Sequence, residues 1–192
     1  DWYHELFEDQ HPVQKHSVSI SGGNKDVKYF LSGSYDKQVG LIKQNPDVYQ
    51  KYNLRSKIDF NINKWFKMSN NTSYFTSSYS FPGVGSVENA FAYAARHALA
   101  SFPQKNPDGS WLYSTPLISG SYNVANGRHI VYGNGNNYNM DKYNDFANTT
   151  ELKFPPMKQF NITANFTYRN YSTSYTNRQT KFDYRIYPDG PI

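Results

Sequence analysis

Residues 52–62 constrain the fold of this chain more than any other stretch, because apolar and polar side chains alternate along them. Leu54, Ile58, Phe60 and Ile62 fall on one side of an extended strand, whereas polar or charged residues dominate the other. The alternation lasts for about ten residues, the length that a tilted strand needs to cross the hydrocarbon layer of a bilayer. Strands of soluble sheets are typically about five or six residues long. The stretch therefore predicts a long strand with two chemically distinct faces.

The composition favours strands of this kind over an ordinary globular core. Of the 192 residues, 38% are hydrophobic and 18% are aromatic. Disordered chains are poor in aromatic residues, whereas strands that each show a single apolar face are rich in them. The absence of Cys excludes disulfides and Cys-based zinc sites. The net charge of +5 comes from scattered Lys and Arg residues, so we expect no nucleic-acid partner.

Other segments show the same period of two, and together they predict about six strands. The segments besides 52–62 are 14–21, 27–38, 65–80, 146–154 and 160–168. Short links at 22–26, 63–64 and 155–158 alternate with long ones at 40–47, 81–143 and from 172 onward. Outer-membrane barrels sort their connections in this way between the periplasmic and external ends. The predicted fold is therefore all-β, an antiparallel up-and-down segment of a larger membrane-spanning β-barrel.

The long middle connection contains one predicted helix, near residues 86–100. Ser86 is a good N-cap, Glu88 suits the first turn, and apolar residues recur at helical spacing. Elsewhere in 81–143 only a few residues, such as 128–132, show strand periodicity. Connections this long are usually functional or disordered. The resulting domain boundaries are 1–13 as a connector, 14–80 as four strands, 81–143 as an external loop, 144–171 as a hairpin and 172–192 as a second external loop.

The alternation also assigns side chains to the two faces of the predicted sheet. The residues expected to face lipid are Leu54, Ile58, Phe60, Ile62, Leu152, Phe160, Ile162 and Phe166. Those expected to face the lumen or a plug within it are Arg55, Lys57, Asp59, Asn61, Glu151, Lys153, Asn161, Asn165 and Arg169. We interpret the second set as solvating the lumen or bracing a plug by ion pairs.

Candidate sites are few. The five His residues lack metal-ligand spacing, and neither a nucleophile motif nor a plausible carboxylate pair is present, so we expect no metal, no cofactor and no enzymatic activity. The stretch 134–137 with Asp141 could ligate calcium, although a flexible loop is the favoured interpretation. Aromatic rings with a polar tip suit stacking on sugars or clamping of peptides. The candidates for substrate contact are Trp111, Tyr113, Tyr122, Tyr132 and Tyr138, which could instead pack the loop against itself or against a partner.

Several motifs, taken as an ordered set, resemble the start of the barrel in SusC-like (RagA/SusC) TonB-dependent outer-membrane transporters. They are residues 14–23 (QKHSVSISGG), 28–32 (KYFLS), 35–40 (YDKQVG) and 52–59 (YNLRSKID), with Asp1-Trp2 and 187–190 (YPDG) in support. The resemblance covers most of residues 1–80 and 144–190.

The resemblance implies a barrel of about 22 strands with a plug in its lumen, driven by TonB and lidded by a SusD-like lipoprotein. Residues 1–13 would then connect from the plug, and 14–80 would be the first barrel strands. No plug or TonB-contacting segment can be matched, so no residues are carried over for those parts. About six strands alone would leave two unpaired edges and an apolar surface, so we also expect the rest of the barrel and a lipid bilayer as partners. The expected cargo is oligosaccharide, with oligopeptide as the alternative. The rival class is a secreted, non-enzymatic β-sandwich that binds carbohydrate.

Overall fold

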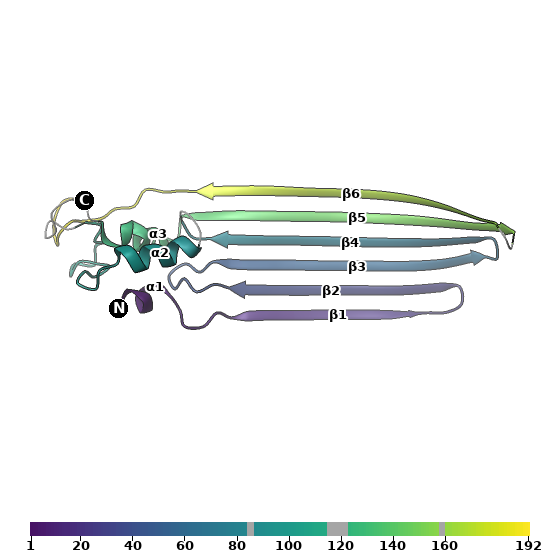
Figure 1. The fold of residues 1–192 in the computed structure, drawn as a ribbon, viewed down its shortest axis with the longest axis horizontal. Helices are drawn as coiled ribbons and strands as arrows, with labels where there is room; N and C mark the ends of the chain where they lie inside the picture. The colour runs from purple at the N-terminus through teal and green to yellow at the C-terminus, as the bar shows by residue number, and fades with distance from the viewer. Residues whose placement is uncertain (84–86, 115–122, 158–159) are drawn as a thin grey trace.

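The computed structural model describes residues 1–83, 87–114, 123–157 and 160–192. Six strands form one antiparallel sheet in which each strand pairs with its neighbours in sequence (Figure 1). The strands are β1 (Val13–Gly23), β2 (Val27–Val39), β3 (Val48–Asn63), β4 (Phe66–Phe81), β5 (Tyr138–Met157) and β6 (Phe160–Arg178). The prediction of an all-β, up-and-down segment is confirmed. The sandwich alternative is wrong, because all six strands belong to a single sheet.

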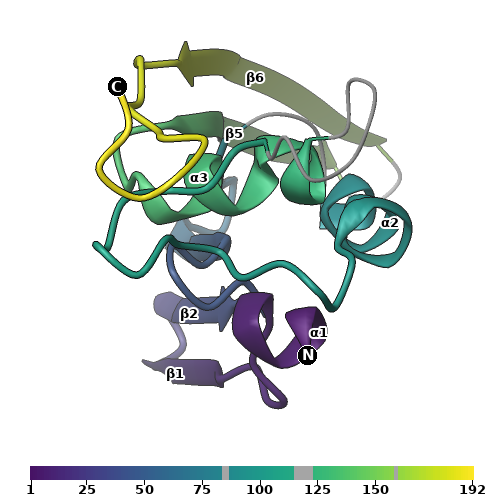
Figure 2. The ribbon, with the colours of Figure 1, turned by 90° about the vertical axis from the view of Figure 1, so that its left-hand side faces the viewer.

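The helices gather at one end of the sheet, together with both chain termini (Figures 1 and 2). They are α1 (Trp2–Leu6), α2 (Val87–His97), the 3₁₀ helix η1 (Val124–Gly127) and α3 (Arg128–Gly133). The helix predicted near 86–100 is α2. Residues 128–132, which showed some strand periodicity, lie in α3 instead, where His129, Ile130 and Tyr132 are buried. Within the described ranges, no helix is long and apolar enough to cross a membrane.

The last two strands extend further than the sequence predicted. β5 begins at Tyr138 instead of residue 144, and β6 continues past Tyr171 to Arg178. The ladder between them is continuous over this extension, from the Tyr138–Arg178 pair onward. β5 also runs through Pro155 and Pro156, which were predicted as a turn. The ladder shifts register between Phe154 and Met157, so the two prolines lie where regular pairing is interrupted.

The strand register brings the two predicted sets of side chains onto opposite faces of the sheet. Leu54 pairs with Gly33 on β2 and Tyr74 on β4, and Tyr74 pairs with Phe146 on β5. We call this side the apolar face; it carries all eight residues predicted to face lipid. Leu54 is 57% exposed and Phe166 is 69% exposed, so the apolar face has no cover within the described chain. The opposite side, the polar face, carries all nine residues predicted to face the lumen.

The apolar face is interrupted at β4 and β5 by a group of amide and hydroxyl side chains. Asn70 Nδ2 donates to Thr150 Oγ1 (2.9 Å), and Asn148 Nδ2 donates to Thr72 Oγ1 (2.7 Å). The two Asn side chains also bond to each other, at 3.2 and 3.3 Å. Because these polar groups satisfy one another, they can lie on an apolar surface without a large desolvation penalty.

The hydrophobic core lies at the helical end and not between the strands. It joins α1, α2, η1 and α3 to the end of β4 and to Ile42, which precedes β3. Phe7 stacks on Phe91 of α2 with ring centroids 4.2 Å apart. Lys43 N donates to the carbonyl of Leu6 (2.9 Å), which fixes the N-terminal segment against the β2–β3 connection. The sheet is therefore attached at one end to a compact cap formed by segments distant in sequence.

Candidate functional site

The cap is organised around His129, which is fully buried between two Trp side chains. Its ring lies 5.3 Å from that of Trp2 and 5.9 Å from that of Trp111, in edge-to-face geometry. His129 Nε2 donates to the carbonyl of Leu112 (2.9 Å). Trp2 Nε1 donates to the carbonyls of Leu99 and Phe102, at 3.0 Å each. The first residues of the chain and the long middle connection are thus parts of one packed unit.

We expect the stability of the cap to depend on pH because His129 is buried within it. Burial lowers the pKa of His129 from 6.5 to about 4, whereas an unfolded His titrates near its ordinary value. Between these values the unfolded cap binds more protons, so stability falls as the pH falls. We expect the cap to lose about 2 kcal/mol between pH 7.5 and pH 5. Hydrogen exchange of α3 in the full-length protein would measure this loss.

A His129→Gln variant should lose most of this pH dependence, even though its cap starts less stable. His11→Gln is a matched control, because His11 is exposed and lies outside the buried cluster. Equal pH dependence in wild type and His129→Gln would show that another group controls the acid response of the cap.

The aromatic residues predicted to contact substrate lie in or next to this cap. Tyr132 is only 1% exposed, so it supports the cap from within. Tyr113 packs on Tyr184, with ring centroids 4.8 Å apart. Trp111 is partly exposed, and Lys105 Nζ lies 4.5 Å from the centre of its ring. Tyr138, at the start of β5, is also partly exposed, and Tyr122 lies outside the described residues. Trp111 and Tyr138 therefore have more surface free for a ligand than Tyr132.

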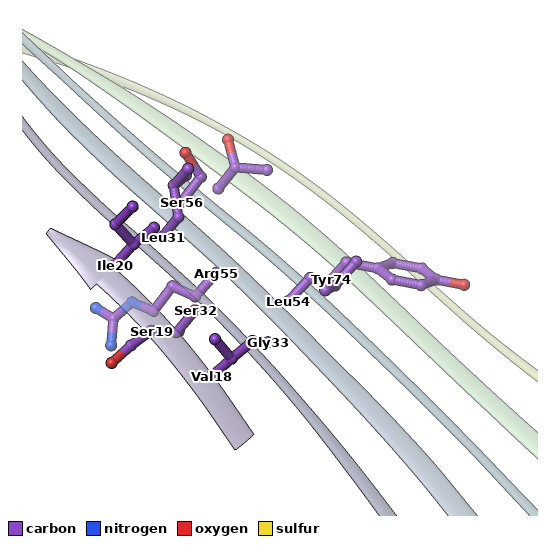
Figure 3. Close-up of a pocket in the computed structure, with 11 residues that line it drawn as sticks. Val18, Ser19, Ile20, Leu31, Ser32, Gly33, Leu54, Arg55, Ser56 and Tyr74 are labelled. Carbon is purple, nitrogen blue, oxygen red and sulfur yellow. The ribbon is translucent and has the colours of Figure 1, made fainter. Parts of the chain in front are cut away.

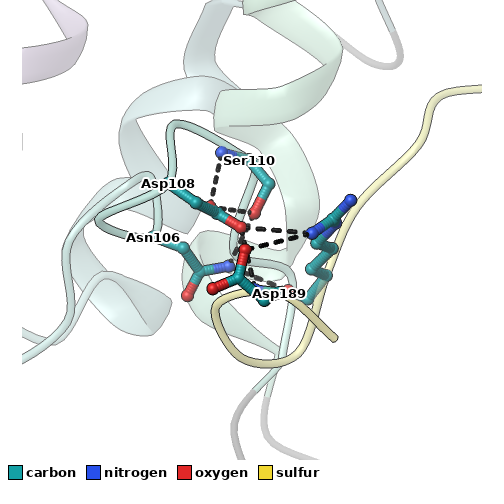
Figure 4. Close-up of polar contacts among 5 residues, drawn as sticks. Asn106, Asp108, Ser110 and Asp189 are labelled. Carbon is teal, nitrogen blue, oxygen red and sulfur yellow. Dashed lines mark hydrogen bonds and ion pairs between the residues drawn. The ribbon is translucent and has the colours of Figure 1, made fainter. Parts of the chain in front are cut away.

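Asp108 ties the middle connection to the C-terminal segment (Figure 4). Its carboxylate accepts hydrogen bonds from the backbone N–H of Asp189 (3.0 Å) and Ser110 (2.9 Å), and pairs with Arg185 Nη1 (3.3 Å). The hydrogen bond from Asp189 is the main reason that the pKa of Asp108 falls to about 2. The YPDG segment recognised in the sequence therefore helps to close the cap.

The stretch considered for calcium makes a different set of contacts. Asn137 Oδ1 accepts from Thr180 N (2.6 Å), and Asn134 Nδ2 donates to Thr180 Oγ1 (3.4 Å). These bonds join the start of β5 to the segment after β6. The parts of the chain that the structure describes contain no cluster of three or more His, Asp or Glu side chains that could hold a metal ion.

On the polar face, most of the predicted lumen charges are paired within the sheet. Lys153 Nζ lies 2.8 Å from Glu151, and Lys57 Nζ lies 3.9 Å from Asp59. Arg169 Nη2 lies 2.6 Å from Asp145 on the neighbouring strand. Exposed pairs of this kind add little stability, but they neutralise charge along the polar face.

The polar face also bears a groove that sequence reasoning missed. We call it the tyrosine groove and define it by Tyr49, Tyr79, Asp141, Tyr143 and Tyr175, with Ser77 and Thr173 between them. It lies near the capped end of β3–β6. The signal was present in the sequence: the alternation of β5 and β6, extended beyond residues 144 and 171, would have placed Tyr143 and Tyr175 on the polar face.

A second hollow lies on the apolar face around Gly33, which has no side chain to fill it. Val18, Ile20, Leu31, Leu54 and Tyr74 line this hollow (Figure 3). Its lining is mostly apolar; Ser56 and Thr72 add two hydroxyls, and the register places the side chain of Arg55, which also borders the hollow, on the polar face. It is suited to an apolar surrounding and offers little for the recognition of a polar nutrient.

Known proteins resemble this chain in both sequence and fold. The chain is 25% identical over 182 residues to the TonB-dependent receptor P26 of Formosa agariphila, covering 94% of this chain and 17% of the receptor. The RagAB peptide importer in its open-open state has the same fold, with a TM-score of 0.65 and 17% identity over 98% of this chain. The closed-closed state of RagAB gives a TM-score of 0.63 over the whole chain. The predicted resemblance to SusC-like TonB-dependent transporters is confirmed.

The chain spans only a small part of these proteins. It covers 17% of the receptor P26 and 20% of the open-open RagAB chain. No protein-family model matches the chain. The small share of these proteins that the chain spans explains why its sheet is open. The edge strands β1 and β6 are exposed along their full lengths.

Proposed function

We propose that this chain forms part of the wall and outer rim of a TonB-dependent nutrient importer in the outer membrane, and that it has no enzymatic role. The observation that carries the proposal is the sheet with two distinct faces. Its strands β3–β6 are 16 to 20 residues long, whereas a tilted strand needs about 9–11 residues to cross a bilayer. The strands therefore cross the hydrocarbon layer and extend beyond it toward the cap.

On this proposal the apolar face contacts lipid and the polar face lines the lumen. The short turns face the periplasm and the cap lies outside the cell, as the sorting of loop lengths in such barrels favours. Residues 1–13, predicted as a connector from the plug, then lie on the external side within the cap. The exposed edges of β1 and β6 pair with further strands of the barrel.

The partners follow from the resemblance. They are TonB, acting through a plug elsewhere in the transporter, and a SusD-like lipoprotein that closes over the cap. Trp111 and Tyr138, partly exposed at this end, are the predicted aromatic residues best placed to touch that lipoprotein or the cargo.

For the cargo we favour oligopeptide, the alternative from the sequence, over oligosaccharide. The aromatic residues predicted to contact substrate suited sugars and peptides alike, and since Tyr132 is buried and Tyr113 packs within the cap, they do not favour sugar. The RagAB importer, which shares the fold, is named for peptides. The shared fold is the observation that supports the choice of peptide.

Uptake by cells that carry or lack the full-length gene tests this proposal. We expect a fluorescent oligopeptide to enter wild-type cells, to be excluded when the gene is deleted, and to be excluded when an uncoupler removes the proton-motive force. Gene-dependent uptake of a labelled oligosaccharide, but not of peptide, would overturn the cargo and leave the importer. Unchanged uptake of both probes after deletion would overturn the importer itself.

A further inference from the structure

The tyrosine groove places a carboxylate among aromatic side chains in a row that spans the four neighbouring strands β3–β6. Asp141 of β5 pairs in register with Tyr79 of β4 and with Tyr175 of β6, and Tyr79 pairs with Tyr49 of β3. All four side chains lie on the polar face and line the same groove. Tyr143, two residues along β5, completes it. These residues form a row across the strands. A ligand that moves through the lumen would contact this row.

Asp141 differs from the other carboxylates of the polar face in having no partner. Asp145 is paired with Arg169 (2.6 Å), Asp36 with Lys51 (3.4 Å) and Glu151 with Lys153 (2.8 Å). Asp141 is exposed, and it makes no ion pair or hydrogen bond with the residues that the structure describes. Its neighbour Lys142 also borders the groove, but the alternation along β5 directs the Lys142 side chain to the opposite face of the sheet. Lys51 Nζ lies 6.0 Å from the centre of the Tyr49 ring but is paired with Asp36, so the carboxylate of Asp141 remains free to pair with a cation from a ligand.

Three of the four tyrosines around this charge already donate their hydroxyl protons to other side chains. Tyr79 donates to Asp47 Oδ2 (3.3 Å), and Tyr175 donates to Asn139 Oδ1 (3.2 Å). Tyr143 donates to Asp145 Oδ2 (3.4 Å). The groove keeps the hydroxyls of Tyr49, Ser77 and Thr173, and the groups that distinguish it are its aromatic surface and one unpaired carboxylate. Aromatic surface combined with a free carboxylate suits an organic cation.

We propose that the tyrosine groove is a subsite for the ammonium or guanidinium group of a basic residue in an oligopeptide. Asp141 forms the ion pair, and Tyr79 and Tyr175 flank the cation. This proposal rests on the proposed function, because it requires the polar face to line the path of the cargo. It adds a preference that the importer function does not imply, namely for peptides that carry Lys or Arg.

The test is equilibrium binding of two blocked synthetic heptapeptides to the purified full-length transporter. One has a central lysine among alanines, and the other has norleucine at that position. We expect the wild type to bind the lysine peptide about tenfold more tightly, because an ion pair and cation–π contacts are lost with norleucine. Asp141→Asn should abolish the difference, and Asp141→Glu, which keeps the charge, should retain part of it.

Asp26→Asn is a matched control, since it changes the net charge equally but lies in the short β1–β2 turn at the opposite end of the sheet. It should keep the tenfold difference, which excludes a nonspecific effect of net charge. Equal binding of the two peptides by the wild type, or no binding of either, would overturn the subsite. Uptake measured in parallel separates the two proposals: import that persists without a lysine preference leaves the importer intact and removes only the subsite.

Discussion

Replacing Trp2 by alanine should destabilise the cap by about 3–5 kcal/mol, the usual cost of removing a buried Trp side chain. Trp2 is only 7% exposed, and its ring packs edge-to-face with that of His129. The substitution would also leave the carbonyls of Leu99 and Phe102 without the indole N–H. Because the cap holds segments from the whole chain, α1, the middle connection and α3 should lose protection together.

Hydrogen exchange of the full-length transporter in detergent would measure this effect, with α2 and α3 as reporters. Trp65→Ala is the matched control, because Trp65 is 55% exposed and lies in the short turn at the other end of the sheet. The control should leave exchange in the cap unchanged. Unaltered protection of α3 in Trp2→Ala would mean that the N-terminal segment is only loosely attached to the cap.

The sheet could be predicted from the sequence because the alternation in each strand is a local signal. The alternation of side chains along a strand assigns Leu54 and Arg55 to opposite faces, and the observed register agrees. Local signals failed at the strand ends. Tyr143 and Tyr175 were read as loop residues, since the apolar side of the alternation fades there while pairing between β5 and β6 continues.

The cap could not be predicted, because its contacts join residues far apart in sequence. Trp2 bonds to carbonyls about a hundred positions later, and Phe7 stacks on Phe91. No periodicity within residues 1–12 or 81–137 indicates such partners. The burial of Tyr132 could not be predicted for the same reason. Its residue type indicated a ligand contact, whereas the structure shows that it is part of the core.

The remaining large effect concerns the apolar face, where Ile58→Arg should destabilise the transporter in a bilayer by about 2–4 kcal/mol, the cost of an arginine at the membrane midplane on the lipid side of a barrel. Ile58 is partly exposed and lies near the middle of the roughly ten residues of β3 that, counted from the short turn, cross the hydrocarbon layer, so the penalty comes mainly from lipid contact. Asn53→Arg, on the polar face of the same strand, is the control. It loses only the hydrogen bond to Ser34, about 1 kcal/mol. Denaturant unfolding of the full-length protein in lipid vesicles measures both variants. If the two arginines cost the same, the apolar face does not contact lipid, and the assignment of the polar face to the lumen is lost with it.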